Sequence, residues 1–370
     1  MSLSKKVCRM SNHRVRARRA SLLRATIMGV GFAAALVGPT MAQDKTDDLV
    51  IVTWGGSLAD QMRQVFFAPF AEAAGVTVRE DTGPDIQRSR AEVESGSPAY
   101  DMTATNLAFY LIGEGQNLWA PIDYSVFDQD ALAKIPDEMK LEHGLAAYVY
   151  AHGMSFSTAA FPEGGPQPQS WADFWDFEKF PGLRAIAACG SASRPVPEAA
   201  LLADGVAMDA LYPLDIDRAA EKLKELAPNV VWWTNASQPG QMLASGEVVM
   251  AMAPTNRIQT LKDEGAPVEI VWNGGQWTYD AWYILKNAPN LANAMDFVAS
   301  TIAPEKQAAF AKASAMAPTN PDAFALLDEE TAAKMPTNPD HMAQMYRKDE
   351  AWWTENRDAW SEACLGATLQ

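Results

Sequence analysis

Cysteine and histidine are scarce in this sequence. Its 370 residues include three cysteines and four histidines, and His143, His152 and His341 are scattered without the short spacings that hold a metal ion. The sequence also lacks the GxSxG, HExxH, GxxxxGK[ST] and GxGxxG motifs of common hydrolase, metalloprotease and nucleotide sites. We therefore expect no metal, no cofactor and no enzymatic activity. A secreted hydrolase stays a remote alternative.

Basic residues are few beyond the N-terminus. Residues 1–42 hold eight of the 30 Lys and Arg and no acid, so residues 43–370 hold 22 basic residues against 46 acidic ones, a net charge of −24. Nucleic acid and anionic membranes would be repelled by so acidic a body. We expect the partner to be a small cationic or zwitterionic molecule, and no nucleic acid.

Long apolar runs are also missing. Residues 25–37 form an uncharged stretch of about 13 residues, against the roughly 20 that span a bilayer. It follows a basic segment and precedes the small-residue pattern of residues 40–42. We interpret residues 1–42 as a signal peptide cleaved after Ala42, which places the rest in the periplasm. A permanent anchor, and twin-arginine export suggested by residues 18–19, are the alternatives.

Two cysteines remain once Cys8 leaves with the signal peptide. Cys189 and Cys364 are an even number in an oxidising compartment, which allows a disulfide between them. We predict this bond, and two unpaired cysteines are the alternative.

Short apolar strands alternate with helical patterns along residues 43–370. Ser170 begins a capping-box pattern after a proline-rich loop. Such alternation predicts an α/β fold with mainly parallel sheets, and the length exceeds what one core usually organises, so two lobes are expected. Strands are predicted at residues 49–54, 76–79, 101–105, 183–188, 230–233, 248–253 and 268–272, and helices at 217–226 and 291–302.

Candidate binding residues follow the predicted strands. Ligands of open α/β sheets lie outside the carboxyl ends of the strands, and a run of aromatics around one carboxylate comes late in the chain. These positions are mostly aromatic or hydrogen-bonding, with few charges. The candidates are Trp54, Gly55, Asn106, Tyr110, Arg194, Trp233, Arg257, Trp277, Tyr279 and Asp280.

The order of several segments resembles a known family. The segments are VTWGGS, YDMTATN, SWADFWD, ASGEVVMAMA, WTYDAWYILKNAPNLANAMDFV and APTNPDA, and together they resemble extracytoplasmic solute-binding proteins of ABC importers, in particular the spermidine/putrescine type. The resemblance implies the two-lobe type II periplasmic binding fold, with crossover strands near residues 144–157 and 277–286 that form a hinge and a ligand cleft. Lobe 1 would comprise residues 43–150 and 280–320, and lobe 2 residues 151–279 and 321–370.

The family's binding residues transfer only in part. Trp54 matches the stacking aromatic after the first strand, and Asp280 matches the carboxylate that holds an amine. The acidic pair of polyamine binders is replaced around residues 192–195, and the tryptophan after the following strand becomes Pro254, with Arg257 nearby. Glu198 could supply a missing carboxylate.

These features predict a monomeric periplasmic protein that captures a small organic amine, such as putrescine or spermidine, and delivers it to a membrane ABC permease. The alternative ligand is an ω-amino acid such as γ-aminobutyrate. It would suit Asp280 at one end and an arginine, Arg194 or Arg257, at the other. A receptor that presents its ligand to a membrane sensor would use the same fold.

Overall fold

The computed structural model describes residues 47–190 and 194–368, and the predicted signal peptide lies outside them. In this part of the chain no helix has both the length and the apolar character needed to cross a membrane. The strands are β1 Asp48–Thr53, β2 Thr77–Thr82, β3 Met102–Asn106, β4 Lys140–Leu141, β5 Gly144–Ser157, β6 Arg184–Ala187, β7 Val230–Trp233, β8 Met250–Pro254, β9 Val268–Ile284 and β10 Met345–Arg347.

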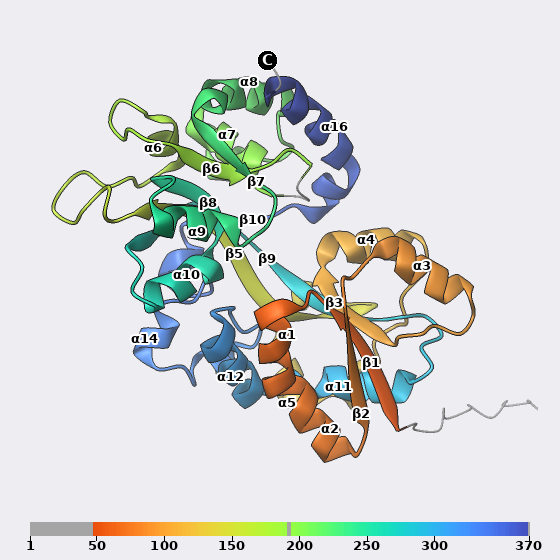
Figure 1. Cartoon of the computed structure of the whole chain (residues 1–370). Coiled ribbons are helices and arrows are strands. Elements are labelled where there is room, and N and C mark those ends of the chain that lie inside the picture. The colour runs from red at the N-terminus through yellow and green to blue at the C-terminus, as the bar shows by residue number, and fades with distance from the viewer. Residues whose placement is uncertain (1–46, 191–193, 369–370) are drawn as a thin grey trace, which may run out of the picture. The chain divides into compact units, whose positions relative to one another are not determined.

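Helices follow most of these strands (Figure 1). The predicted capping box is confirmed, since the side chain of Ser170 accepts a hydrogen bond from the backbone N–H of Asp173 at 3.3 Å. The α-helices are α1 Gly56–Met62, α2 Ala68–Ala74, α3 Ile86–Glu94, α4 Leu107–Gly115, α5 Gln129–Leu132, α6 Trp171–Trp175, α7 Val196–Ala203, α8 Ile216–Leu226, α9 Gln238–Ser245, α10 Thr255–Asp263, α11 Leu291–Ser300, α12 Pro304–Ser314, α13 Pro321–Phe324, α14 Glu329–Ala332, α15 Pro339–Met342 and α16 Glu350–Thr368.

One sheet runs through the described residues in the order β2-β1-β3-β9-β5-β8-β6-β7. The strands β2, β1 and β3 pair in parallel, and so do β8, β6 and β7. The long strands β5 and β9 run antiparallel between these two groups (Figure 1). The predicted mixed α/β class with crossover strands is therefore confirmed, and β5 spans the predicted residues 144–157.

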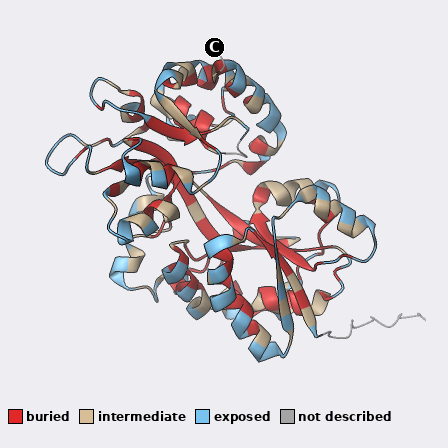
Figure 2. Cartoon of the chain, viewed as in Figure 1, coloured by how far each residue is buried: buried red, intermediate tan, exposed pale blue. Residues whose placement is uncertain are grey.

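Two clusters of buried apolar side chains pack against this sheet. The first cluster draws on residues 49–149 and 279–335, and the second cluster draws on residues 154–271 and 346–367. The chain passes from one cluster to the other along β5 and returns along β9, and much of both strands is buried (Figure 2). The lobe boundaries given above stay a prediction.

Strand β9 is longer than the sequence indicates. Residues 268–272 were expected as a strand separate from the second crossover, but β9 is continuous over Val268–Ile284. Gly274 adopts φ 72° within it, and a Cβ there would lie 2.8 Å from Trp171 Cδ1. A glycine tolerates this backbone conformation and close approach, so the strand continues through Gly274, in a stretch where its pairing with β5 is irregular.

The C-terminal helix α16 is joined covalently to the second cluster. Cys364 on α16 forms a disulfide with Cys189, which follows β6, across a sequence separation of 175 residues. Trp353, Trp360 and Cys364 are buried on one side of the helix. The helix is thus docked by both apolar contact and a covalent bond.

Candidate ligand-binding site

Asp280 is a buried carboxylate on β9. It is 4% exposed, and its Oδ2 accepts hydrogen bonds from Trp54 Nε1 at 2.9 Å and from the Tyr148 hydroxyl at 2.7 Å. Burial raises the pKa of the Asp280 carboxyl, against the lowering effect of these hydrogen bonds. Within residues 47–190 and 194–368, no Lys or Arg lies within ion-pairing distance of it. The site therefore holds an acid that only neutral donors contact.

Trp54 presents an open aromatic face beside this acid. It follows β1 directly and is 45% exposed, the reverse of a core tryptophan. Gly55 has φ 75° and begins the turn into α1, where a Cβ would lie 3.0 Å from Thr82 Cγ2. An exposed indole next to a carboxylate is a good position for an ammonium group, because the ring face and the acid both attract a cation.

Alternate residues of β5 extend the site away from Asp280. Tyr148, Tyr150 and His152 share one face of the strand, because side chains alternate between the faces. The ring centroids of Tyr148 and Tyr150 are 6.4 Å apart, and those of Tyr150 and His152 are 5.8 Å apart. This aromatic row connects Asp280 to the next charged group.

That charged group is Arg194, in the segment before α7. Its Nη1 donates a hydrogen bond to Nε2 of His152, and its guanidinium lies 5.8 Å from the centre of the Trp233 ring. Burial lowers the pKa of Arg194, an effect that nearby Tyr150 and Asp280 oppose. Across the described ranges 47–190 and 194–368, no carboxylate lies within ion-pairing distance of this guanidinium.

Two more predicted residues lie at the edge of this arrangement. Asn106 is the cross-strand neighbour of Asp280, but its Oδ1 accepts a hydrogen bond from Phe109 N at 3.2 Å and so caps α4. Arg257 on α10 donates to the Ser57 hydroxyl on α1 at 3.2 Å. This contact links the ends of helices that follow β8 and β1.

Four predicted residues make no contact with the Asp280 carboxylate. Trp233 is fully buried and donates through Nε1 to the Met252 carbonyl at 3.1 Å, and its ring centre lies 5.8 Å from the Arg194 guanidinium. Tyr110 stacks on Tyr283, with ring centroids 5.6 Å apart. Trp277 and Tyr279 both pack against the Arg347 guanidinium.

The alternation of β9 explains the placements of Trp277 and Tyr279, and that of Tyr110 through its stacking on Tyr283. Trp277, Tyr279 and Tyr283 occupy odd positions, so their side chains point to the face opposite Asp280. The structure does not bring them, or Tyr110, together with the acid.

Comparison with known proteins identifies the fold family. A model of the bacterial extracellular solute-binding protein family matches residues 66–344. The chain belongs to this family. Its role as a substrate-binding component of an ABC transporter, predicted above, is thereby confirmed. Relatives of this kind are periplasmic or extracellular binding proteins rather than enzymes, and they bind small ligands and interact with a membrane permease.

The relatives are named for different ligands. A γ-aminobutyric acid-binding protein of Pseudomonas aeruginosa is 31% identical over 340 residues, covering 90% of this chain and 92% of its own. A spermidine/putrescine-binding periplasmic protein of Salmonella typhimurium is 30% identical over 138 residues, covering 37% and 38%.

Solved structures agree on the two-lobe fold. An ABC transporter substrate-binding protein from Bradyrhizobium japonicum has a TM-score of 0.80 at 34% identity, covering 88% of this chain and all of its own. A GABA receptor of known structure has a TM-score of 0.78 at 29% identity, covering 87% and 97%.

Glu198 of the binding protein belongs to a buried structural network. Its Oε1 accepts hydrogen bonds from the Tyr212 hydroxyl at 2.6 Å, Trp353 Nε1 at 2.8 Å and Gln276 Nε2 at 3.1 Å. Burial raises the pKa of the Glu198 carboxyl. These bonds tie α7 to α16 and β9, so this acid holds protein groups together.

Replacing Glu198 with alanine should lower the free energy of unfolding by about 3 kcal/mol, because three buried donors lose their acceptor. Urea denaturation measures this change. The matched variant Glu198→Gln keeps an acceptor oxygen and should stay within about 1 kcal/mol of the wild type. An alanine variant as stable as the glutamine variant would contradict the structural role.

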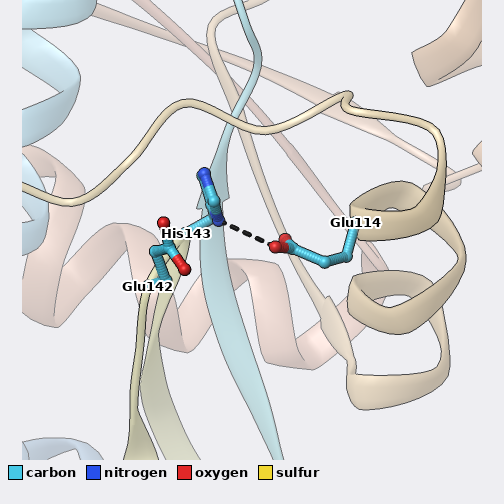
Figure 3. A group of neighbouring side chains, drawn as sticks. All are labelled: Glu114, Glu142 and His143. Atoms are coloured by element: carbon cyan, nitrogen blue, oxygen red, sulfur yellow. Dashed lines mark ion pairs between the residues drawn. The ribbon is translucent and has the colours of Figure 1, made fainter.

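A second group of polar side chains lies on the Tyr110 side of β9. Glu114 on α4 approaches Glu142 and His143 from the turn between β4 and β5, and their ligand atoms lie within 4.8 Å of one another (Figure 3). His143 Nδ1 is 3.1 Å from Glu114 Oε1. Sequence spacing alone gave no sign of this group, because Glu114 is remote in the chain. Both glutamates are exposed, and the contact described within the group is the one between His143 and Glu114.

Proposed function

We propose that this binding protein captures a small ω-amino acid, a zwitterion such as γ-aminobutyrate, as a monomer in the periplasm and delivers it to the permease of an ABC importer. One observation carries the proposal. The site contains one acid without a cationic partner, Asp280, and one guanidinium without an anionic partner, Arg194, within the described residues. A molecule with one charge of each sign satisfies both.

The ligand would lie along the aromatic row. Its ammonium group would pair with Asp280 and lie against Trp54, and its carboxylate would accept a bidentate pair of hydrogen bonds from Arg194. Trp54 follows β1 in the first parallel group, and Arg194 lies between β6 and α7 in the second. Ligand bound to both groups would stabilise a closed form by linking them about the hinge strands β5 and β9.

The comparisons support the zwitterion over a polyamine. The relative named for γ-aminobutyric acid aligns over 90% of this chain at 31% identity, whereas relatives named for spermidine and putrescine align over 37% at 30% identity and over 61% at 26% identity. A diamine also needs a carboxylate at each end, because a buried ammonium without one is costly. Glu198, which the sequence suggested as that second acid, is fully buried, and its Oε1 accepts hydrogen bonds from three protein donors.

Calorimetric titration of wild type and Arg194→Ala with γ-aminobutyrate and with putrescine tests this proposal. The wild type should bind γ-aminobutyrate more tightly, and loss of the charge-assisted pair should weaken that binding roughly 10- to 100-fold. Arg257→Ala is the matched control, and since Arg257 donates a hydrogen bond to the Ser57 hydroxyl its loss should weaken binding less than about tenfold. Tighter binding of putrescine by the wild type, retained in Arg194→Ala, would refute the zwitterion assignment.

A further inference from the structure

Arg194 has an unusual partner for a desolvated guanidinium. Several more exposed arginines pair with carboxylates, such as Arg88 with Asp81 at 2.6 Å and Arg218 with Asp204 at 2.6 Å, and the fully buried Arg184 donates to the backbone carbonyls of residues 174, 180 and 182. Arg194 instead donates to Nε2 of His152, a ring that is 4% exposed. The acceptor for this arginine is an imidazole.

The imidazole is electrically neutral. Burial lowers the pKa of His152 well below its usual value, and the nearby charges of Arg194 and Lys348 act in the same direction. A ring nitrogen that accepts a hydrogen bond carries no proton, so the proton of the neutral ring is on Nδ1. His152 therefore orients the guanidinium while leaving its positive charge uncompensated.

The fold keeps the neighbouring buried acids away from Arg194. Glu350 accepts hydrogen bonds from Lys348 Nζ at 2.7 Å and from the Thr278 hydroxyl at 3.0 Å. Glu198 is engaged by its three donors. Thr278 and the Glu198 donor Gln276 are the cross-strand neighbours of Tyr150 and His152 on β9. Glu350 and Glu198 therefore bind other protein groups beside this part of β5 and β9.

We propose that His152 is the specificity-determining residue of the site: a neutral acceptor that positions Arg194 for a ligand carboxylate without neutralising it. This inference rests on the proposed function, since it needs a ligand with an anionic end. A carboxylate at position 152 would form an ion pair with Arg194 and remove the attraction for that end. The remaining acid, Asp280, would then favour a purely cationic ligand.

Titration calorimetry of wild type, His152→Glu and His152→Gln with γ-aminobutyrate and putrescine tests the inference. The expected result for His152→Glu is a loss of at least about 30-fold in γ-aminobutyrate affinity without a parallel loss for putrescine, so that the ratio of the two affinities inverts. Glutamine offers a neutral acceptor, so His152→Gln should keep the wild-type preference. A purely structural role would lower both affinities together in both variants.

The outcomes separate the two proposals. A wild type that binds putrescine more tightly, or binds neither compound, overturns the proposed function and with it the role of His152. A wild type that prefers γ-aminobutyrate, with a folded His152→Glu variant that keeps this preference, overturns the role of His152 alone. If thermal unfolding shows that His152→Glu does not fold, His152→Leu decides: it should lose about tenfold for γ-aminobutyrate only, and unchanged selectivity refutes the inference.

Discussion

Replacing Asp280 with asparagine should weaken ligand binding at least about a hundredfold, about 2.7 kcal/mol, with the fold intact. The ligand's ammonium would lose its buried counter-ion, an outcome that typically costs several kcal/mol. Asparagine keeps an oxygen that can accept from Trp54 and Tyr148, so the packing around position 280 survives. Calorimetry measures the affinity, and exposed Asp217→Asn on α8 is the control. Unchanged affinity in Asp280→Asn would remove this residue from the site.

The same variant should make the ligand-free protein more stable at neutral pH. Burial raises the folded-state pKa of Asp280 above its unfolded value of about 4. The stability associated with its protonated form is fully present below that value and is lost as pH rises through the folded-state pKa. Asparagine does not titrate, so the variant avoids this loss. Urea denaturation between pH 4 and 7 should show its advantage growing with pH, and a constant difference would contradict the burial effect.

Removing the disulfide should give the largest loss of stability. The bond between Cys189 and Cys364 closes a sequence separation of 175 residues, and the chain-entropy model assigns about 5 kcal/mol to a loop of that size. Cys364→Ser should lower the free energy of unfolding, measured by urea denaturation, by this amount, and so should a reductant added to wild type. The reductant should leave Cys364→Ser unchanged, which separates the bond from other effects of the reagent. A wild-type midpoint that is insensitive to reductant would show that the cysteines are not bonded in solution.

Much of the fold follows from local sequence patterns. Alternating apolar runs and helical spacings located the strands within a few residues, and β7 matches the predicted residues 230–233. The order of family-like segments also located β5 as a crossover. The pattern failed at Gly274, where a glycine pair looks like a turn between two strands. Only the packing of Trp171 against that glycine shows why the strand continues.

Single residues of the site could be predicted from the sequence, but the contacts between them could not. Trp54 and Asp280 were both selected from sequence, and the structure joins them by a hydrogen bond across 226 residues. Period-two alternation along β9 could have set Trp277 and Tyr279 apart from Asp280, because they differ from it by odd numbers of residues. Nothing in the sequence marked His152 as a site residue, because a lone histidine within a strand is common.

The sequence by itself determined the class of the protein. Apolar periodicity and acidic charge are local properties of each segment, and the order of the segments is read directly along the chain. Which buried charges keep a partner was decided only by the tertiary structure. Glu350 pairs with the cation Lys348, whereas Asp280 and Arg194 have only neutral partners among the described residues. The physical reason is that desolvation and pairing depend on which groups from distant segments meet in space. These contacts between distant segments leave one acid, Asp280, and one guanidinium, Arg194, for the ligand.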